Sequence, residues 1–242
     1  MRASPSFSAA VLTALLSVVA AGCAAAAEDP APGGSTAAPA GSGAPTNLGD
    51  DAAPPEADAG APSEADAAPT PPAYPAAPFG KTKGKVFPDL AIEGYRDGTG
   101  DWTPIAMSDY YDPDGARGVR AVYVLIVAQW CSVCMQEAAQ LPKEYAAKWK
   151  GRGAKFVMAL AQDRSGKSPS KTTVDQWKSS FPAINFDLVV DPTSSFLPPA
   201  STGFPTCLLI DPKTMKVLEV MPGVTSDGSI PGLDELLTRN GG

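Results

Sequence analysis

The chain has 242 residues with 19 basic and 26 acidic side chains, which gives a formal net charge of −7. The charge is unevenly distributed, because Arg2 is the only basic residue before Lys81 whereas eight acidic residues lie between them. From Lys81 onward the counts are 18 basic and 18 acidic, so this part has no basic field of the kind that binds nucleic acid.

The first 23 residues have the pattern of a bacterial export signal. Arg2 is followed by an apolar stretch, 9–21, that is short for a membrane span. Residues 20–23 are similar to a lipobox, in which Cys23 carries a lipid anchor, whereas ordinary cleavage after Ala27 is the alternative. Either route places the mature protein outside the cytoplasm, where disulfides persist. We expect a lipoprotein anchored to the membrane of the cell envelope through Cys23 and facing the periplasm.

Residues 24–80 are dominated by Ala, Pro, Gly, Ser, Asp and Glu, and they include an eight-residue near-repeat at 53–60 and 61–68. Large apolar side chains are almost missing, so little burial offsets the conformational entropy of ordering. We therefore predict a disordered linker whose ends lie ~40 Å apart on average. Such a tether lifts the following domain, 81–242, away from a membrane.

The domain at 81–242 is long enough for one substantial core. A run rich in β-branched residues, 119–127, predicts a central strand covered on both faces. Around it the pattern predicts short strands at 87–92, 102–107, 155–161, 186–190, 206–210 and 216–220, and helices at 132–150, 173–180 and 233–239.

Local signals refine these elements. Pro142 should kink the first helix, and Thr172 or Thr173 should cap the second. The connection at 211–213 is short enough for an antiparallel hairpin between the last two strands. The order of elements predicts an α/β fold in which a mixed sheet has helices on both faces.

Cys131 and Cys134 lie where the central strand meets the following helix, directly after Trp130. Cysteines at positions i and i+3 can form a disulfide within the first helical turn. A helix N-terminus carries a partial positive charge and free N–H donors, which favour a thiolate. A thiolate beside a partner thiol performs disulfide exchange. The pair is therefore the candidate catalytic, redox-active disulfide.

These residues resemble the thioredoxin superfamily, in particular its exported TlpA-like branch. Residues 130–134 match the motif W-C-x-x-C, Glu137 matches a glutamate that often follows the second cysteine by three, and 203–211 match G-x-P-T-x-x-L-I-D. The resemblance covers about residues 86–240. It implies a thioredoxin-like sheet and an enzyme, without a cofactor, that exchanges disulfides with protein thiols and disulfides of the cell envelope.

The resemblance also implies that the Phe204–Pro205 peptide bond is cis and turned toward the cysteine pair. The backbone N–H and C=O of Phe204 would then pair with an extended client segment, so Phe204, Pro205 and Trp130 are expected to bind substrate. Cys131 is expected to attack as the thiolate, with its pKa lowered from about 8.5 toward 7. Cys134 is expected to release the product by closing the intramolecular disulfide.

Several residues depart from the family pattern. Residues 132–133 are Ser-Val in place of Gly-Pro, Leu125 stands where thioredoxin has a buried aspartate, and Pro142 comes later in the helix. No proton acceptor is therefore evident for the resolving thiol. We expect Glu137 to be a solvated charge on the helix surface and Cys207 to be a free thiol in the core.

Another class of function remains open, namely a non-catalytic thioredoxin-fold lipoprotein that binds copper or a protein partner. Two thiolates suit Cu(I), but the chain has no histidine to complete the ligand set of copper-delivery relatives. Zinc would need three or four ligands, so we predict no metal site. Met135 after Cys134 excludes c-type haem attachment, and the peroxiredoxin pattern P-x-x-x-T-x-x-C is missing. The motif leaves open the electron donor or acceptor and the direction, reductase or oxidase.

Overall fold

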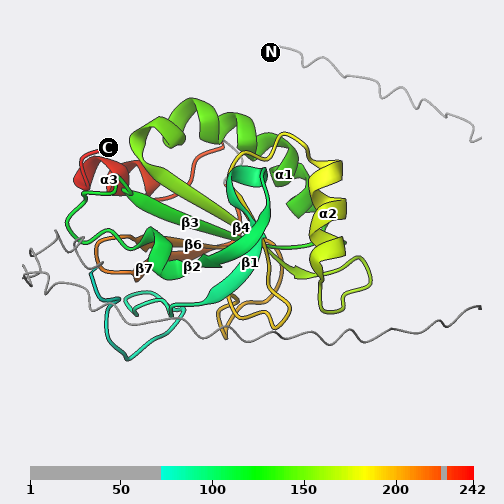
Figure 1. The fold of residues 1–242 in the computed structure, drawn as a ribbon, viewed down its shortest axis with the longest axis horizontal. Coiled ribbons are helices and arrows are strands. Elements are labelled where there is room, and N and C mark those ends of the chain that lie inside the picture. The colour runs from blue at the N-terminus through cyan, green and yellow to red at the C-terminus, as the bar shows by residue number, and fades with distance from the viewer. Residues whose placement is uncertain (1–71, 225–227) are drawn as a thin grey trace, which may run out of the picture. The chain divides into compact units, whose positions relative to one another are not determined.

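The computed structural model describes residues 72–224 and 228–242 (Figure 1). The predicted signal with Cys23 and residues 24–71 of the predicted linker lie outside these ranges. Contacts with the domain begin before Lys81, because the Tyr74 hydroxyl donates a hydrogen bond to the Phe87 carbonyl at 2.8 Å. Within the described ranges no helix is long and apolar enough to cross a membrane.

The described residues form one seven-stranded sheet and three α-helices, in the predicted order. The strands are β1 (Ala91–Tyr95), β2 (Trp102–Ala106), β3 (Ala121–Ala128), β4 (Ala154–Gln162), β5 (Asp187–Val190), β6 (Thr206–Asp211) and β7 (Lys216–Met221). The α-helices are α1 (Ser132–Glu144), α2 (Lys171–Ser180) and α3 (Leu233–Arg239), and a 3-10 helix, η2 (Met107–Tyr110), follows β2.

The strand order in the sheet is β2-β1-β5-β4-β3-β6-β7. Strands β3, β4 and β5 run parallel, and the other neighbouring pairs run antiparallel. All eight residues of β3 are buried, as its continuous apolar run predicts for a strand with neighbours on both sides. The predicted mixed sheet and the predicted β6–β7 hairpin are thus confirmed.

Each face of the sheet has its own hydrophobic core. Successive side chains of a strand point to opposite faces, so Tyr123 of β3 belongs to one core and Val122 to the other. Buried side chains of α1, α2 and α3 all pack into the core that contains Tyr123. The opposite core is closed by η2 and by connecting segments that contribute Phe87, Phe196 and Met215.

The chain direction explains why α1 and α2 share a face. The crossovers β3–α1–β4 and β4–α2–β5 step the same way across the sheet, and crossovers between parallel strands are right-handed. Two right-handed crossovers in one direction place both helices on the same face (Figure 1). The predicted helical cover therefore consists of α-helices on one face and the short helix η2, with loops, on the other.

The first helix differs from its prediction after Pro142. The α-helical pattern continues through this proline to Glu144 and then passes into a π-helical turn, Tyr145–Trp149. The Tyr145 N–H is shared between the carbonyls of Leu141 and Pro142. The irregularity predicted at the proline thus lies in the turn that follows it.

The second helix also begins earlier than predicted. It starts at Lys171, so the residue that precedes it is Ser170 rather than Thr172 or Thr173. The Ser170 N–H donates a hydrogen bond to Thr173 Oγ1 at 3.1 Å, which satisfies a backbone donor at the helix start. Thr173 therefore supports the helix N-terminus from within the first turn.

Candidate functional site

The two cysteines lie at the junction between the end of β3 and the start of α1. Cys131 is the residue before the first turn of α1, and Cys134 lies within that turn. They form a disulfide with a Cα–Cα distance of 5.2 Å. Cys131 keeps 5 % of its surface exposed and Cys134 keeps none, so Cys131 is the more accessible sulfur.

The start of α1 directs backbone donors at Cys131. The Cys134 N–H donates a hydrogen bond to Cys131 Sγ at 3.1 Å, so the sulfur occupies the capping position of the helix. Capping donors and the positive end of the helix dipole stabilise negative charge on a sulfur. The geometry therefore favours the thiolate of Cys131 whenever the disulfide is reduced.

Pro205 and Phe204 lie beside this sulfur. The Phe204–Pro205 peptide bond is cis, as the resemblance implied. The Phe204 carbonyl oxygen is 3.5 Å from Cys131 Sγ. The Thr206 hydroxyl donates a hydrogen bond to the Gly203 carbonyl at 2.7 Å and so closes the loop around Pro205 at the start of β6. Two motifs about 70 residues apart in the sequence thus meet at one sulfur.

Trp130 lies beside the same site. Its side chain is 48 % exposed, and its indole N–H donates a hydrogen bond to Gln162 Oε1 at 2.8 Å. Its ring meets the Phe204 ring edge to face, with centroids 6.0 Å apart. Trp130 is therefore held at the surface beside the cysteine pair rather than packed into the core.

Glu137 is buried, so the prediction of a solvated charge is wrong. It is 6 % exposed, and its Oε1 accepts a hydrogen bond from the Val224 N–H at 2.9 Å. Its Oε2 is buried and has no hydrogen-bond partner among the described residues. Burial raises the pKa of the Glu137 carboxyl, and the Val224 hydrogen bond partly opposes this rise. A protonatable group thus lies one helical turn beyond Cys134.

The spacing along α1 contained a signal for this burial. Residues three and four apart lie on one face of a helix. Cys134, Glu137, Ala138 and Leu141 follow that spacing and are all buried. The face is apolar except for the carboxyl group, which is why the amino-acid type alone suggested a surface position.

Cys207 is a buried free thiol within the described part of the chain, as predicted. Burial raises the pKa of its thiol well above the ordinary value, and the nearby Glu137 carboxylate adds to the rise. The Tyr123 hydroxyl lies close to this sulfur and has no nitrogen or oxygen partner among the described residues. Glu137, Cys207 and Tyr123 therefore form a buried polar cluster in the core that also contains the cysteine pair.

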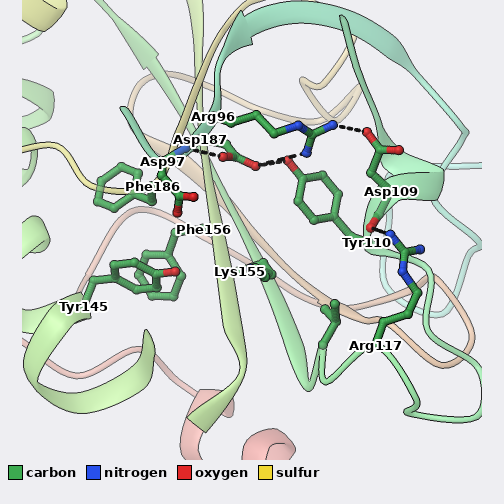
Figure 2. Close-up of a pocket in the computed structure, with 11 residues that line it drawn as sticks. Arg96, Asp97, Asp109, Tyr110, Arg117, Tyr145, Lys155, Phe156, Phe186 and Asp187 are labelled. Carbon is green, nitrogen blue, oxygen red and sulfur yellow. Dashed lines mark hydrogen bonds and ion pairs between the residues drawn. The ribbon is translucent and has the colours of Figure 1, made fainter. Parts of the chain in front are cut away.

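A second polar cluster lies at the opposite end of the sheet, where β3, β4 and β5 begin. It surrounds a cavity of about 290 Å³ (Figure 2). Asp187 accepts hydrogen bonds from the Tyr110 hydroxyl and from the Asp97 N–H, the latter at 2.7 Å. Arg96 pairs with Asp109 and lies 3.8 Å from Asp187.

This second cluster links the segments around β1 and β2 to β5. Burial raises the pKa of Asp187, whereas the hydrogen bonds from Tyr110 and Asp97 lower it. Arg96 pairs with both Asp109 and Asp187, and Arg117 donates hydrogen bonds to backbone carbonyls. The cluster lies away from the cysteines, which follow the other end of β3. We therefore interpret it as structural.

Within residues 72–224 and 228–242, no three His, Cys, Asp or Glu side chains gather in a way that could hold a metal ion. The structure brings five of the predicted site residues together: Trp130, Cys131, Cys134, Phe204 and Pro205. The sixth, Cys23, lies outside the described residues.

No family model and no curated protein matches the chain. Among solved structures it is similar to a putative thiol:disulfide interchange protein DsbE from Chlorobium tepidum, with 25% identity and a TM-score of 0.48 over 66% of this chain and 99% of that chain. It is also similar to the exposed lipoprotein thioredoxin of Streptococcus pneumoniae, with 23% identity and a TM-score of 0.46; the match covers 61% of this chain and 99% of that chain. A third similar structure is a reduced 2-Cys peroxiredoxin from Plasmodium vivax, with 20% identity and a TM-score of 0.46; the match covers 64% of this chain and 78% of that chain.

The chain's own geometry carries the assignment of the fold. The sheet places β3 between parallel β4 and antiparallel β6. A Cys-x-x-Cys disulfide begins α1 at the end of β3, and a cis-proline precedes β6 beside it. Together these features make up a thioredoxin-like fold with its redox-type cysteine pair, as the sequence motifs predicted.

Proposed function

We propose that the protein is an extracytoplasmic thiol–disulfide oxidoreductase that acts on protein clients through Cys131 and Cys134. The observation that carries this proposal is the position of Cys131 Sγ. It accepts the Cys134 N–H at the start of α1, and it lies 3.5 Å from the carbonyl that precedes cis-Pro205. A sulfur that is stabilised as a thiolate and open to an extended backbone is equipped for disulfide exchange.

In the reductase direction the Cys131 thiolate attacks one sulfur of a client disulfide, and the other client sulfur leaves as a thiolate. Cys134 then attacks Cys131 Sγ, the remaining client sulfur leaves, and the intramolecular disulfide closes. The client gains two electrons, which the cysteine pair loses. The two client thiolates take protons from the surroundings, and the one proton of the Cys134 thiol is released when it attacks. Oxidation of a client is the same path in reverse.

The second step needs a proton acceptor, because the attacking form of Cys134 is the thiolate and Cys134 is fully buried. Glu137 supports this step, since its carboxyl lies one turn further on the same buried face of α1. Its raised pKa brings proton uptake closer to neutral pH. We assign Glu137 the role of proton acceptor for the resolving thiol.

The location and the anchor rest on the sequence pattern of residues 1–23. In this proposal lipidated Cys23 holds the protein at the membrane, the linker at 24–80 spans the distance to the domain at 81–242, and the clients are envelope proteins. Mass spectrometry of the mature N-terminus tests the anchor. A diacylglyceryl group on Cys23 is expected, and cleavage after Ala27 would contradict the anchor without affecting the exchange chemistry.

The exchange chemistry is tested by trapping. The Cys134→Ser variant should accumulate mixed disulfides with envelope proteins through Cys131, because the resolving thiol is missing. The Cys131→Ser variant is the matched control and should trap none. If neither sulfur of the wild-type pair changes oxidation state in any physiological couple, the proposal is wrong. The reduction potential of the Cys131–Cys134 pair then indicates whether the protein reduces or oxidises its clients. A value of about −270 mV favours a reductant, and a value of about −120 mV favours an oxidant.

A further inference from the structure

An apolar groove is lined in part by Phe204 and Pro205, the residues that lie beside the cysteine pair. It has a volume of about 520 Å³ and lies between the loop that precedes β6 and the end of β7. Phe204, Pro205, Val220 and Met221 contribute to its lining, and none of the described residues that line it is charged. A groove without charge suits an apolar occupant and disfavours a charged one, because an unpaired charge loses its hydration there.

Exposed apolar side chains connect this groove with the redox site. Among the described residues, the large hydrophobic side chains that remain exposed are Phe79, Trp130, Val133 and Val220. Trp130 and Val133 flank Cys131 in the sequence, and Val220 is 40 % exposed in the groove. Exposed apolar groups that gather around one site mark an interaction surface.

Phe204 joins the two parts. Its carbonyl lies 3.5 Å from Cys131 Sγ, its ring contacts Trp130, and it also lines the groove. A client whose sulfur is bonded to Cys131 therefore has the groove next to its neighbouring residues.

The groove also follows an open sheet edge. β7 is the outermost strand, and backbone hydrogen bonds from the segment at 84–85 cover it only at Val217. Within the described chain no backbone hydrogen bond reaches its outer side between Leu218 and Met221, where the Lys83 side chain pairs with Glu219. An open edge accepts an extended chain, so both the shape and the edge fit an extended occupant.

We propose that this groove binds an extended, uncharged and apolar segment of the client next to its reactive cysteine, with Val220 as a specificity-determining residue. The proposal rests on the proposed function and adds the class of client. Such segments are exposed in unfolded or partly folded polypeptides. The preferred substrates are therefore disulfides in apolar, extended stretches rather than disulfides surrounded by charge.

The test uses synthetic disulfide peptides that differ only in the three residues on one side of the cysteine, either Val-Leu-Val or Asp-Ser-Asp. The second-order rate constant of exchange with the reduced protein is measured for each peptide and for hydroxyethyl disulfide, which is too small to reach the groove. Each three-residue flank is placed before the cysteine in one peptide and after it in another. In at least one of these two placements we expect the apolar peptide to react at least tenfold faster than the acidic one.

Variants locate the effect. Val220→Asp should lower the ratio of the apolar-peptide rate to the hydroxyethyl disulfide rate at least tenfold. Val220→Lys should raise the acidic-peptide rate relative to Val220→Asp. Phe79→Asp is the matched control, because Phe79 is 48 % exposed and does not line the groove, and it should leave the ratio unchanged.

The outcomes separate the two proposals. If the wild-type protein reacts equally fast with the apolar and the acidic peptides, the proposal that the groove binds clients is wrong, whereas the proposed exchange function still holds. The same holds if Phe79→Asp lowers the ratio as much as Val220→Asp does. If neither peptides nor hydroxyethyl disulfide react, the proposed function itself fails. Circular dichroism of each variant confirms that the fold is retained before rates are compared.

Discussion

Glu137 of α1 accepts a hydrogen bond from the Val224 N–H, although the two residues are 87 positions apart in the chain. This bond joins the helix that carries the cysteine pair to the segment after β7. The same segment approaches Pro205, because a Cβ built on Gly223 would lie 3.0 Å from Pro205 Cγ and 2.2 Å from Glu137 Oε1. The segment after β7 thus connects the buried Glu137 carboxyl on the cysteine-bearing helix with the cis-proline loop at Pro205.

The buried carboxyl predicts a pH-dependent stability. Because burial raises the pKa of Glu137 in the folded protein above its ordinary value of about 4.5, the folded state holds this proton more tightly than the unfolded state. Its contribution to the free energy of unfolding is therefore fully present below the ordinary pKa and falls as the pH rises through the folded pKa.

Glu137→Gln lacks this titration. The stability of the variant relative to wild type should therefore increase as the pH rises above about 4.5, the ordinary pKa of the group. Denaturant titrations of both proteins at several pH values measure the difference. Parallel pH profiles of the two proteins would contradict the burial of an ionisable Glu137.

The same residue predicts a kinetic effect on the second step of exchange. Glu137→Gln should slow the attack of Cys134 on the mixed disulfide at least about tenfold, because general-base assistance is typically worth more than that. The first attack by Cys131 should be little changed, since its thiolate is stabilised by the helix start. Rapid acid quench followed by mass spectrometry resolves the two steps.

A control on the same helix separates catalysis from structure. Glu144 is partly exposed and pairs with Lys148, so Glu144→Gln should change neither step. The dependence of the resolution rate on pH should also flatten in Glu137→Gln and keep its shape in Glu144→Gln. An unchanged pH profile in Glu137→Gln would remove the assigned role.

The free thiols of the reduced protein should differ sharply in reactivity. Cys207 is fully buried and the pKa of its thiol is raised, whereas Cys131 is partly accessible and capped by a backbone N–H. Alkylation by iodoacetamide near pH 8 should therefore be at least about 100-fold slower at Cys207 than at Cys131. Peptide mapping after timed quenching measures both rates. In denaturant the two should become similar, and fast labelling of Cys207 in the native state would show that it is not a core thiol.

The polar cluster at the opposite end of the sheet should matter for stability and not for exchange. Asp187→Ala leaves the Tyr110 hydroxyl and the Asp97 N–H without their acceptor (Figure 2), which should cost about 2–4 kcal/mol of unfolding free energy. Asp234→Ala, which removes an exposed partner of Arg152, should cost less than about 1 kcal/mol. Urea titrations measure both. A loss of exchange rate in folded Asp187→Ala, in excess of the unfolded fraction, would argue against a purely structural cluster.

The sequence alone determined those features that depend on neighbouring residues. The apolar run of β3, the hairpin of β6 and β7, and α3 are visible because hydrophobic periodicity and turn residues act over a few positions. The cysteine pair at the start of α1 and the cis-proline before β6 were predictable from two short motifs. In both motifs, the backbone conformation of a few neighbouring residues positions the reactive sulfur or the client-binding carbonyl.

Tertiary structure alone decided what depends on contacts between distant segments. Glu137 is buried because the segment after β7 covers it and donates a hydrogen bond to it, and no residue near Glu137 in the sequence reports that contact. β1 pairs with β5 through a close approach at Gly94, where a Cβ would lie 2.3 Å from the Leu188 carbonyl. The apolar groove is likewise built by two loops and the end of an edge strand, so its surface appears only once the sheet has assembled. Local pattern specifies elements and motifs, whereas burial, partners and surfaces are properties of the packed chain.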